Sequence, residues 1–151
     1  MNKEVANYLN ETVATYGLFY IKLHQHHFYV KGPDFFTLHE KFEELYETMH
    51  EQFDEAAERL VTIGGKPYAT LKEYIDHSII KEKPYDGADE KEMVVSTVSD
   101  LRTLSEHLEK GIKLTGDTGD EVTQDRLVDY RTEIDKNIWM FQAFLGKSPQ
   151  E

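Results

Sequence analysis

One stretch of the sequence, residues 39–58, concentrates side chains that can bind a cation. It holds eight acidic residues and two histidines but only one lysine. Within it, His39 and Glu43, and again Asp54 and Glu58, are four positions apart, so on a helix each pair lies on one turn. Carboxylate oxygens and imidazole nitrogens are ligands for iron, manganese, zinc or magnesium. Thiolate metal sites and disulfides are excluded because the chain has no cysteine.

The charges of this stretch separate into two helical faces, because each helical residue turns by roughly 100°. The face beside the apolar stripe holds, within about 80° of arc, the side chains of His39, Glu43, Tyr46, His50 and Asp54. Glu58 follows about 40° further round. The acids that point farther away are Glu44, Glu51 and Glu55. The outward acids are predicted to be solvated, whereas the first face is a polar seam that either binds metal or only borders the core.

The two pairs are too far apart to serve one ion in one chain. They are about 15 residues, and hence roughly 22 Å, apart along a helix. If two copies of the helix crossed antiparallel near Thr48 and Met49, the first pair of one copy would meet the second pair of the other. An isologous dimer does this automatically and makes two equivalent sites. The spacing therefore predicts a site at a subunit interface.

Two alternatives stay open at this point. A di-iron site inside one bundle needs a Glu-x-x-His on each of two helices and a Glu from each of two others. Residues 47–50 match that motif once, and no long helix repeats it. His27 continues the apolar stripe of the first helix after Leu23, so it is either a packed core residue or a ligand facing the same interface. His24 and His26 have no such positional support.

Long helices are needed to position these residues, and four are predicted where apolar residues recur every three or four positions, at about 3–30, 37–63, 89–114 and 121–145. The second is expected to start with a capping box at Thr37 and Glu40. A short helix with its own capping pattern is predicted at 70–79, within the long connection. Residues 115–120 are predicted to form a loop. Val122 is predicted to be the first inward-facing residue of the last helix. Two short connections and one long one indicate an all-α, ferritin-like antiparallel four-helix bundle with a short extra helix between helices two and three.

Length and composition limit the class of protein. At 151 residues the chain is expected to form one domain spanning residues 1–151. Its net charge of −12 repels phosphate backbones and attracts cations. Residues 1–17 lack the basic and apolar regions of a signal peptide, and no apolar run approaches the length of a membrane span. We therefore expect a cytoplasmic protein with no membrane partner.

The sequence resembles the Dps-type mini-ferritins, the DNA-binding proteins from starved cells, along nearly the whole chain. The segments that carry the resemblance are HHFYVKGPDFFTLHEKFEELYE from residue 26, DEAAERLVTIGGKP from residue 54, TLKEYIDHS from residue 70 and IDKNIWMFQAFLGK from residue 134. The most specific feature is the spacing His-x11-His-x3-acid, then x10-Asp-x3-Glu.

The resemblance implies a hollow homododecamer with the short helix at the two-fold interface and a ferroxidase centre between two-fold-related subunits. By position, the catalytic residues and metal ligands would be His27, His39 and Glu43 of one subunit with Asp54 and Glu58 of its partner. Family members bind iron, oxidise Fe(II), usually with hydrogen peroxide, and store the ferric mineral. The implied function is therefore iron storage and detoxification by a ferroxidase, which limits hydroxyl-radical production and oxidative damage.

The chain departs from the family pattern at several positions. Glu43 stands where the family often has Asp, and Phe28 replaces a common Trp, which removes an oxidisable aromatic from beside the site. Acids line the family's three-fold pores, and Glu121 and Asp125 match them in position, while Gly116 stands where a further acid is common. The favourable interaction of an acid with a helix N-terminus explains Glu121 equally well.

DNA binding in the family generally depends on a flexible tail rich in Lys and Arg. Only Lys3 precedes the first helix and only Lys147 follows the last, and the net charge is −12, so we expect no direct DNA binding. Two other interpretations stay open. One is a non-enzymatic protein that protects or compacts DNA, and the other is a structural zinc or other divalent ion at the interface.

Overall fold

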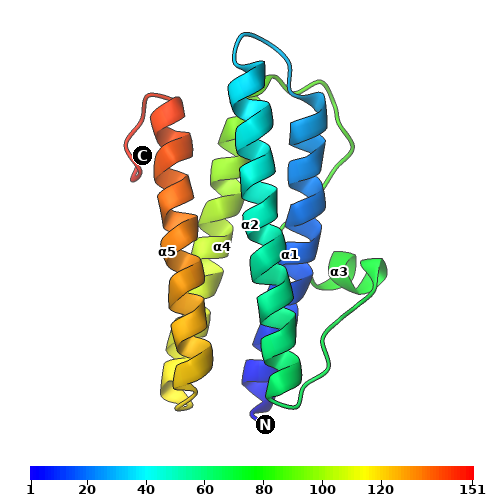
Figure 1. The fold of residues 1–151 in the computed structure, drawn as a ribbon, viewed down its shortest axis with the longest axis vertical. Coiled ribbons are helices and arrows are strands. Elements are labelled where there is room, and N and C mark those ends of the chain that lie inside the picture. Colours follow the sequence, from blue (N-terminus) through cyan, green and yellow to red (C-terminus); the bar gives the residue numbers. More distant parts are fainter.

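The computed structural model describes all residues, 1–151, and consists of helices without strands. In chain order the elements are α1 (Lys3–Tyr29), α2 (Phe35–Thr62), α3 (Leu71–His77), α4 (Glu90–Asp117) and α5 (Glu121–Phe144). The four long helices run side by side, and the short α3 stands beside α1, away from the bundle axis (Figure 1). The predicted all-α four-helix bundle with an extra helix in its long connection is confirmed. The N-cap at the short helix is also confirmed, since the Thr70 hydroxyl accepts from the Glu73 N–H at 3.2 Å.

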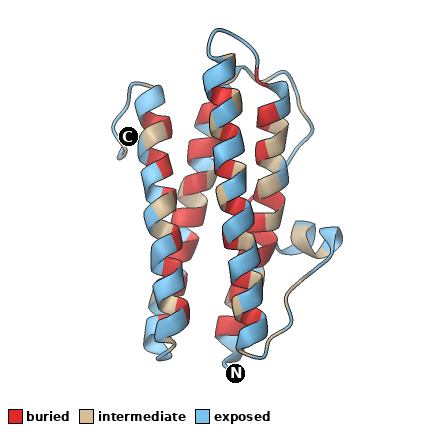
Figure 2. Ribbon diagram, in the orientation of Figure 1, coloured by how far each residue is buried: buried red, intermediate tan, exposed pale blue.

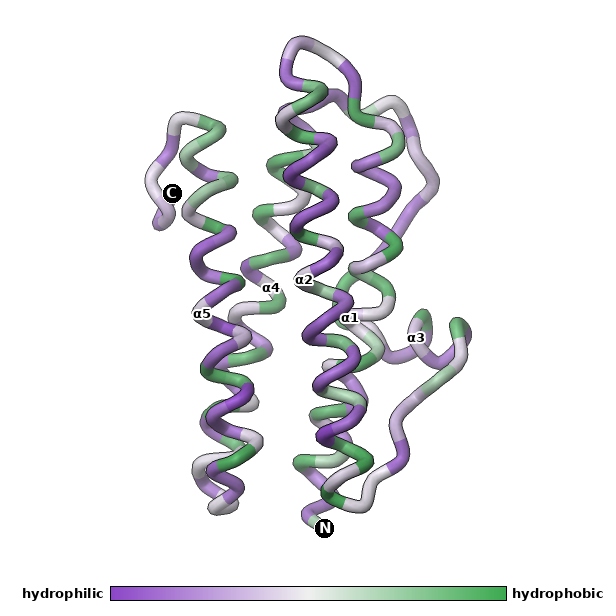
Figure 3. The backbone as a smooth tube through the Cα atoms, viewed as in Figure 1, coloured by the Kyte–Doolittle hydropathy of each residue, from purple (hydrophilic) through white to green (hydrophobic).

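Each long helix buries one stripe of its surface against the others (Figure 2). Hydrophobic and hydrophilic residues alternate at helical spacing along the chain, as Figure 3 shows. α1 packs mainly on α2, and α4 mainly on α5. The centre of the core is made of large side chains with almost no exposure, among them Phe19, Phe42, Met49, Leu101 and Phe141. Burial of one such side chain stabilises the fold by about 1.5–3 kcal/mol.

The start of α2 differs from the prediction, because the capping box expected at Thr37 and Glu40 is wrong. The helix begins earlier, at Phe35, with Asp34 at its N-cap. The connection from α1 turns at Gly32, whose φ of 133° favours glycine. Glu90, at the start of α4, accepts a hydrogen bond from the Asp34 N–H at 2.9 Å. A carboxylate from a distant helix therefore helps to set where α2 begins, and no local capping pattern contains that information.

The loop predicted at residues 115–120 is shorter than expected, because α4 continues to Asp117. Its last turn is held by a hydrogen bond from the Thr115 hydroxyl to the Gly111 carbonyl (2.8 Å) and by an ion pair between Lys113 and Asp117 (2.8 Å). Gly119, with φ of 74°, then makes the turn toward α5.

The inward position predicted for Val122 is wrong, since this side chain is 65% exposed. The neighbouring Thr123 is buried instead. Its hydroxyl donates to Asp120 at 2.6 Å and accepts from Arg59 Nε at 2.9 Å. This polar network fixes the rotation of the first turn of α5, so the valine faces outward.

One histidine, His107, is built into the packing between α1 and α4. Its ring is 5% exposed, stacks on Tyr8 with centroids 4.4 Å apart, and places Nε2 2.7 Å from the Thr12 hydroxyl. Nδ1 lies 3.4 Å from the Glu11 carboxylate. Burial, with a smaller contribution from Lys110, lowers the pKa of His107 to about 4. His107 is therefore a neutral packing residue with a partner at each ring nitrogen.

No helix combines the length and the apolar composition that a membrane span requires.

Candidate metal centre

The side chains of His27 and His39 form a stacked pair between the end of α1 and the start of α2. Their ring centroids are 3.7 Å apart and their planes are inclined by 13°. His27 Nδ1 bonds to the His39 carbonyl at 2.7 Å, and His39 Nδ1 bonds to the His27 carbonyl at 2.8 Å. A carbonyl oxygen can only accept, so each Nδ1 carries the hydrogen. In the neutral imidazole the lone pair is then on Nε2, where it is available to a metal ion.

Glu43 joins this pair from the next turn of α2. Its Oε1 lies 3.8 Å from His27 Nε2 and accepts a hydrogen bond from the Tyr46 hydroxyl at 3.3 Å. An ion with bonds of about 2.0–2.2 Å fits between donor atoms at that separation. The His27 side chain is 9% exposed and that of Glu43 49% exposed, so the open side of this half-site faces outward from the chain. His27 is buried, and its Nε2 also faces a carboxylate, so its position is compatible with both candidate roles.

Asp54 and Glu58 lie together farther along α2, on exposed turns. A hydrogen bond with Asp54 and the repulsion of its charge raise the pKa of Glu58. The distance from this pair to His39 is roughly 22 Å by helical rise. The structure thus stacks His27 on His39 with Glu43 next to His27, and it places Asp54 and Glu58 farther along α2.

Within the single chain, no three His, Cys, Asp or Glu side chains converge closely enough to hold one ion. The Glu-x-x-His match at residues 47–50 is not completed by another helix, because Glu47 and His50 are exposed. The His50 ring packs beside Tyr20 and Phe53, with centroids 5.6 and 6.4 Å away. The candidate centre therefore consists of two separated half-sites.

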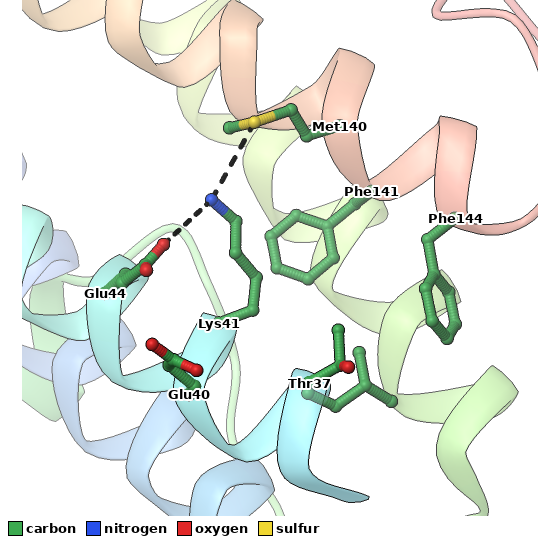
Figure 4. Close-up of a pocket in the computed structure, with 8 residues that line it drawn as sticks. Thr37, Glu40, Lys41, Glu44, Met140, Phe141 and Phe144 are labelled. Carbon is green, nitrogen blue, oxygen red and sulfur yellow. Dashed lines mark hydrogen bonds and ion pairs between the residues drawn. The ribbon is translucent and has the colours of Figure 1, made fainter. Parts of the chain in front are cut away.

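A hollow of about 390 Å³ between α2 and α5 is a separate feature (Figure 4). Its apolar wall is formed by Leu38, Phe141 and Phe144, and Lys41 crosses it to reach Glu44 (3.3 Å) and the sulfur of Met140 (3.9 Å). None of the five predicted ligands lines it.

Known proteins share both the sequence and the fold of this chain. The Ferritin-like domain family model matches residues 6–150. "DNA protection during starvation protein 2" of Bacillus anthracis is 46% identical over 97% of this chain and 100% of its own length. A solved structure of Dps from Listeria innocua, soaked with zinc, is 45% identical, covers 97% of this chain and 99% of its own, and superposes with a TM-score of 0.94. The chain belongs to the Dps family of ferritin-like proteins.

Membership of the Dps family confirms the ferritin-like fold and the resemblance on which the ligand expectations rest. A variant of the Listeria innocua Dps with two histidines replaced by glycine also matches, with 43% identity over 97% of each chain and a TM-score of 0.96. The family supports a role in iron storage or DNA protection.

Around the histidine pair, this Dps-family chain places aromatic rings whose role the sequence did not predict. The Tyr46 ring stacks on His24 with centroids 3.8 Å apart and stands edge-on to His27 at 5.3 Å. Burial and the neighbouring Glu43 raise the pKa of Tyr46. Tyr20 lies edge-on to Tyr46 at 5.6 Å. The i,i+4 spacing of Tyr20 and His24, with Tyr46 on the predicted polar seam, was the available signal for this cluster.

The two acids compared with the pores of the Dps family lie on the first turns of α5. Glu121 is its first residue and Asp125 follows one turn later, and both are exposed. Asp120 caps this helix and is held by Arg59 at 3.3 Å. The two acids are therefore presented to solvent from a fixed helix end.

Proposed function

We propose that this protein stores and detoxifies iron by oxidising Fe(II), with hydrogen peroxide as oxidant, at ferroxidase centres shared between two copies of the chain. Iron is the substrate, and the ferric product is kept inside a hollow dodecamer. The observation that carries the proposal is the reciprocal bonding of His27 and His39, which directs both Nδ1 atoms to carbonyls and leaves both Nε2 atoms for a metal. The two histidines replaced in the Listeria innocua variant are also 12 positions apart.

The donor set suits both oxidation states of iron. Imidazole nitrogen suits Fe(II), whereas hard carboxylate oxygen stabilises Fe(III). In the proposed centre His27, His39 and Glu43 of one copy bind from one side. Asp54 and Glu58 of the second copy bind from the other, and the limited ligand number leaves positions open for peroxide.

Several apolar side chains support the pairing of two copies. Leu71 and Ile75 of α3, with Ile21 of α1, are all more than half exposed and lie around one hollow at the α1–α3 junction. Tyr74 packs flat on Gly17, where a Cβ would come within 2.9 Å of its ring. An exposed apolar patch beside the polar seam is the expected composition of a subunit interface.

The proposed reaction balances without any other reductant. Each Fe(II) gives one electron, and hydrogen peroxide takes two. Two Fe(II), one peroxide and two protons therefore give two Fe(III) and two water molecules. Because both electrons come from iron at one centre, the peroxide O–O bond is cleaved without releasing hydroxyl radical.

Glu121 and Asp125 are proposed to attract Fe(II) toward a pore of the shell. Their exposure at the start of α5 and the net charge of −12 favour cation approach. Direct DNA binding is not part of the proposal, because the same charge repels the phosphate backbone.

The decisive test is anaerobic loading of size-fractionated protein with Fe(II), followed by peroxide, while ferric absorbance is recorded. We expect faster oxidation than in a protein-free control, and equal rates would exclude the ferroxidase function. The variant Asp54→Ala/Glu58→Ala should assemble but lose the activity. Its control, Glu44→Ala/Glu51→Ala, removes two exposed carboxylates from the outward-pointing acids of α2 and should retain it.

Complementation tests whether the centre is shared. Copies carrying His27→Ala/His39→Ala and copies carrying Asp54→Ala/Glu58→Ala are each expected to be inactive. In a mixed dimer one of the two sites receives both intact halves, so random co-assembly should restore about a quarter of the sites. No recovery in verified mixed assemblies would show that each centre is built within one chain.

DNA protection is the second candidate function, because the curated relatives carry that name. A gel-shift experiment at low salt separates the two, since retardation of DNA by the assembled protein would favour direct covering of DNA. A third possibility is that zinc or another divalent ion occupies the interface site as a structural ion. Metal analysis after purification tests it, because stoichiometric zinc that blocks Fe(II) oxidation would indicate a structural ion.

A further inference from the structure

The Glu-x-x-His motif in the middle of α2 takes no part in the proposed ferroxidase centre. Its two members, Glu47 and His50, are both exposed and lie within one turn of each other. The His50 ring is positioned by Tyr20 and Phe53, whose ring centroids lie 5.6 and 6.4 Å away. No three metal-binding side chains converge within the chain, so this imidazole and this carboxylate are an incomplete set of donors.

Both groups of the motif are free of polar partners. The nearby Glu55 is held by Arg126 at 3.4 Å and by the Tyr130 hydroxyl at 3.1 Å, whereas the Glu47 carboxylate forms no ion pair or hydrogen bond within the chain. The His50 ring contacts aromatic rings, and neither of its nitrogens is hydrogen-bonded. The charge of Glu47 and the lone pair of His50 are therefore available to a group outside the chain.

The antiparallel crossing that builds the proposed ferroxidase centres also completes this motif. That register sets His39 of one copy opposite Glu58 of the second copy, and by the same count it sets Glu47 opposite His50 of the second copy. On the helical wheel, His50 and Glu47 lie about 20° and 80° from His39, inside the arc of about 100° that ends at Glu58. The motif therefore faces the second copy in the same direction as the proposed iron ligands.

The four groups of the two motifs lie around one point on the two-fold axis. Positions 47 and 50 are on either side of the crossing point at Thr48 and Met49, so all four groups fall within about 5 Å along the helix axes. Packed helices have axes about 8–10 Å apart, so side chains from both helices meet in the gap. The proposed ferroxidase centres lie roughly 11 Å to either side of this point.

We propose that Glu47 and His50 of two copies together bind one divalent cation of the zinc type on the two-fold axis, an inference that rests on the pairing of copies in the proposed function but not on iron oxidation. Two imidazole nitrogens and two carboxylate oxygens supply the four ligands of a tetrahedral site. Four protein ligands leave no open position for a substrate, so the ion is structural and connects the two copies. Its charge compensates the two carboxylates that the crossing brings together.

The test measures the binding of zinc alone to metal-free, assembled protein. The background variant His27→Ala/His39→Ala removes the imidazoles of the ferroxidase centres, and equilibrium dialysis then counts the zinc that remains bound. We expect one zinc ion per two chains. Adding His50→Ala removes both imidazoles of the proposed site and should lower the zinc affinity by more than about a hundredfold. Adding Glu47→Gln instead, which keeps the shape of the side chain, should also weaken binding.

His77 provides the matched control. It is an exposed histidine of α3, stacked on Tyr68 with centroids 4.4 Å apart, and His77→Ala in the same background should leave zinc binding unchanged. Size-exclusion chromatography verifies that every variant is assembled. The proposal is overturned if the background variant binds no zinc, if it binds one ion per chain, or if His50→Ala binds as tightly as the background.

The outcome is separable from that of the proposed function, because iron oxidation is measured on the wild type and zinc binding on the background variant. Rapid Fe(II) oxidation together with no zinc bound at His50 refutes only the axial site. Zinc bound at one ion per two chains and lost in His50→Ala, together with Fe(II) oxidation no faster than the protein-free control, supports the axial site and refutes the ferroxidase function.

Discussion

His107 and the His27–His39 pair are both imidazole environments lined by α1, with His107 and His27 buried and His39 half-buried, but they leave different atoms free. At His107 both ring nitrogens have partners inside the chain, the Thr12 hydroxyl at 2.7 Å and the Glu11 carboxylate at 3.4 Å. At the pair, each Nδ1 is bonded to a carbonyl and each Nε2 is left available. The first arrangement is complete within one chain, whereas the second has unused donor atoms beside a carboxylate.

Burial alone therefore does not distinguish a packing histidine from a metal ligand. His26 makes the same point, since it is buried against Phe42 and burial lowers its pKa to about 4, yet its Nε2 has no hydrogen-bond partner and it forms no ion pair. The two kinds of histidine differ in their ring nitrogens. In a candidate ligand one ring nitrogen is hydrogen-bonded to a backbone carbonyl, and the second ring nitrogen faces another metal-binding group.

The largest effect is expected from removing one imidazole of the pair. His27→Ala should slow Fe(II) oxidation by about a hundredfold, the upper end of what loss of a group supporting a metal site produces. His107→Ala should leave the rate per assembled protein within about twofold of wild type, because its removal costs stability and not a ligand. Initial rates of ferric absorbance measure both, and equal losses in the two variants would show that His27 and His107 do not differ in role.

Stability should respond in the opposite order. His107→Ala leaves a cavity beside Tyr8 and removes two polar contacts, so it should lower the free energy of unfolding by about 2–4 kcal/mol. His27→Ala should cost less, because one face of its ring opens toward the exposed Glu43. Urea unfolding of both variants checks this order, and a larger loss in His27→Ala contradicts it.

The pH dependence of stability should isolate the burial of His107. Its pKa is lowered from 6.5 to about 4, so between these values the unfolded chain binds a proton that the folded chain excludes. Stability is therefore complete above pH 6.5 and is lost as the pH falls through this window. From neutral pH to about pH 5, wild type should lose about 2 kcal/mol more than His107→Gln. His26 contributes equally to both proteins, and parallel pH profiles would show that His107 is not the source.

The smallest effect should come from the exposed partner of His107. The Glu11 side chain is 49% exposed and lies 3.4 Å from Nδ1, so Glu11→Gln should change the free energy of unfolding by no more than about 0.5 kcal/mol. A loss of several kcal/mol in the same urea experiment would mean that His107 depends on this carboxylate more than on burial and the Thr12 contact.

Much of the fold was predictable because its signals are local. Apolar residues at helical spacing gave the long helices to within a few residues at most ends, and Thr70 marked the start of α3. The errors occur where a distant group decides a local structure. Glu90 of α4 bonds to the turn before α2, and Arg59 of α2 bonds to Thr123, which turns Val122 outward. Neither partner is near its target in the sequence.

The candidate centre was predictable to the level of ligand type and spacing. The i,i+4 rule grouped His39 with Glu43 and Asp54 with Glu58, and the rise of a helix separated the two pairs. The sequence left His27 undecided, because a position on an apolar stripe fits both a core residue and a ligand. The contacts of Tyr46 were also out of reach, because those with His24 and His27 join two helices.

The sequence by itself determined which residues share a helical face, which elements form, and that one chain holds its two groups of donors too far apart for one ion. These properties follow from the fixed turn and rise of a helix. Only the tertiary structure decided which ring nitrogens are free, because the carbonyls of His27 and His39 reach the opposite imidazoles only once α1 and α2 pack together. Hydrogen-bond geometry of this kind depends on tenths of an ångström between segments, which residue type and spacing do not encode.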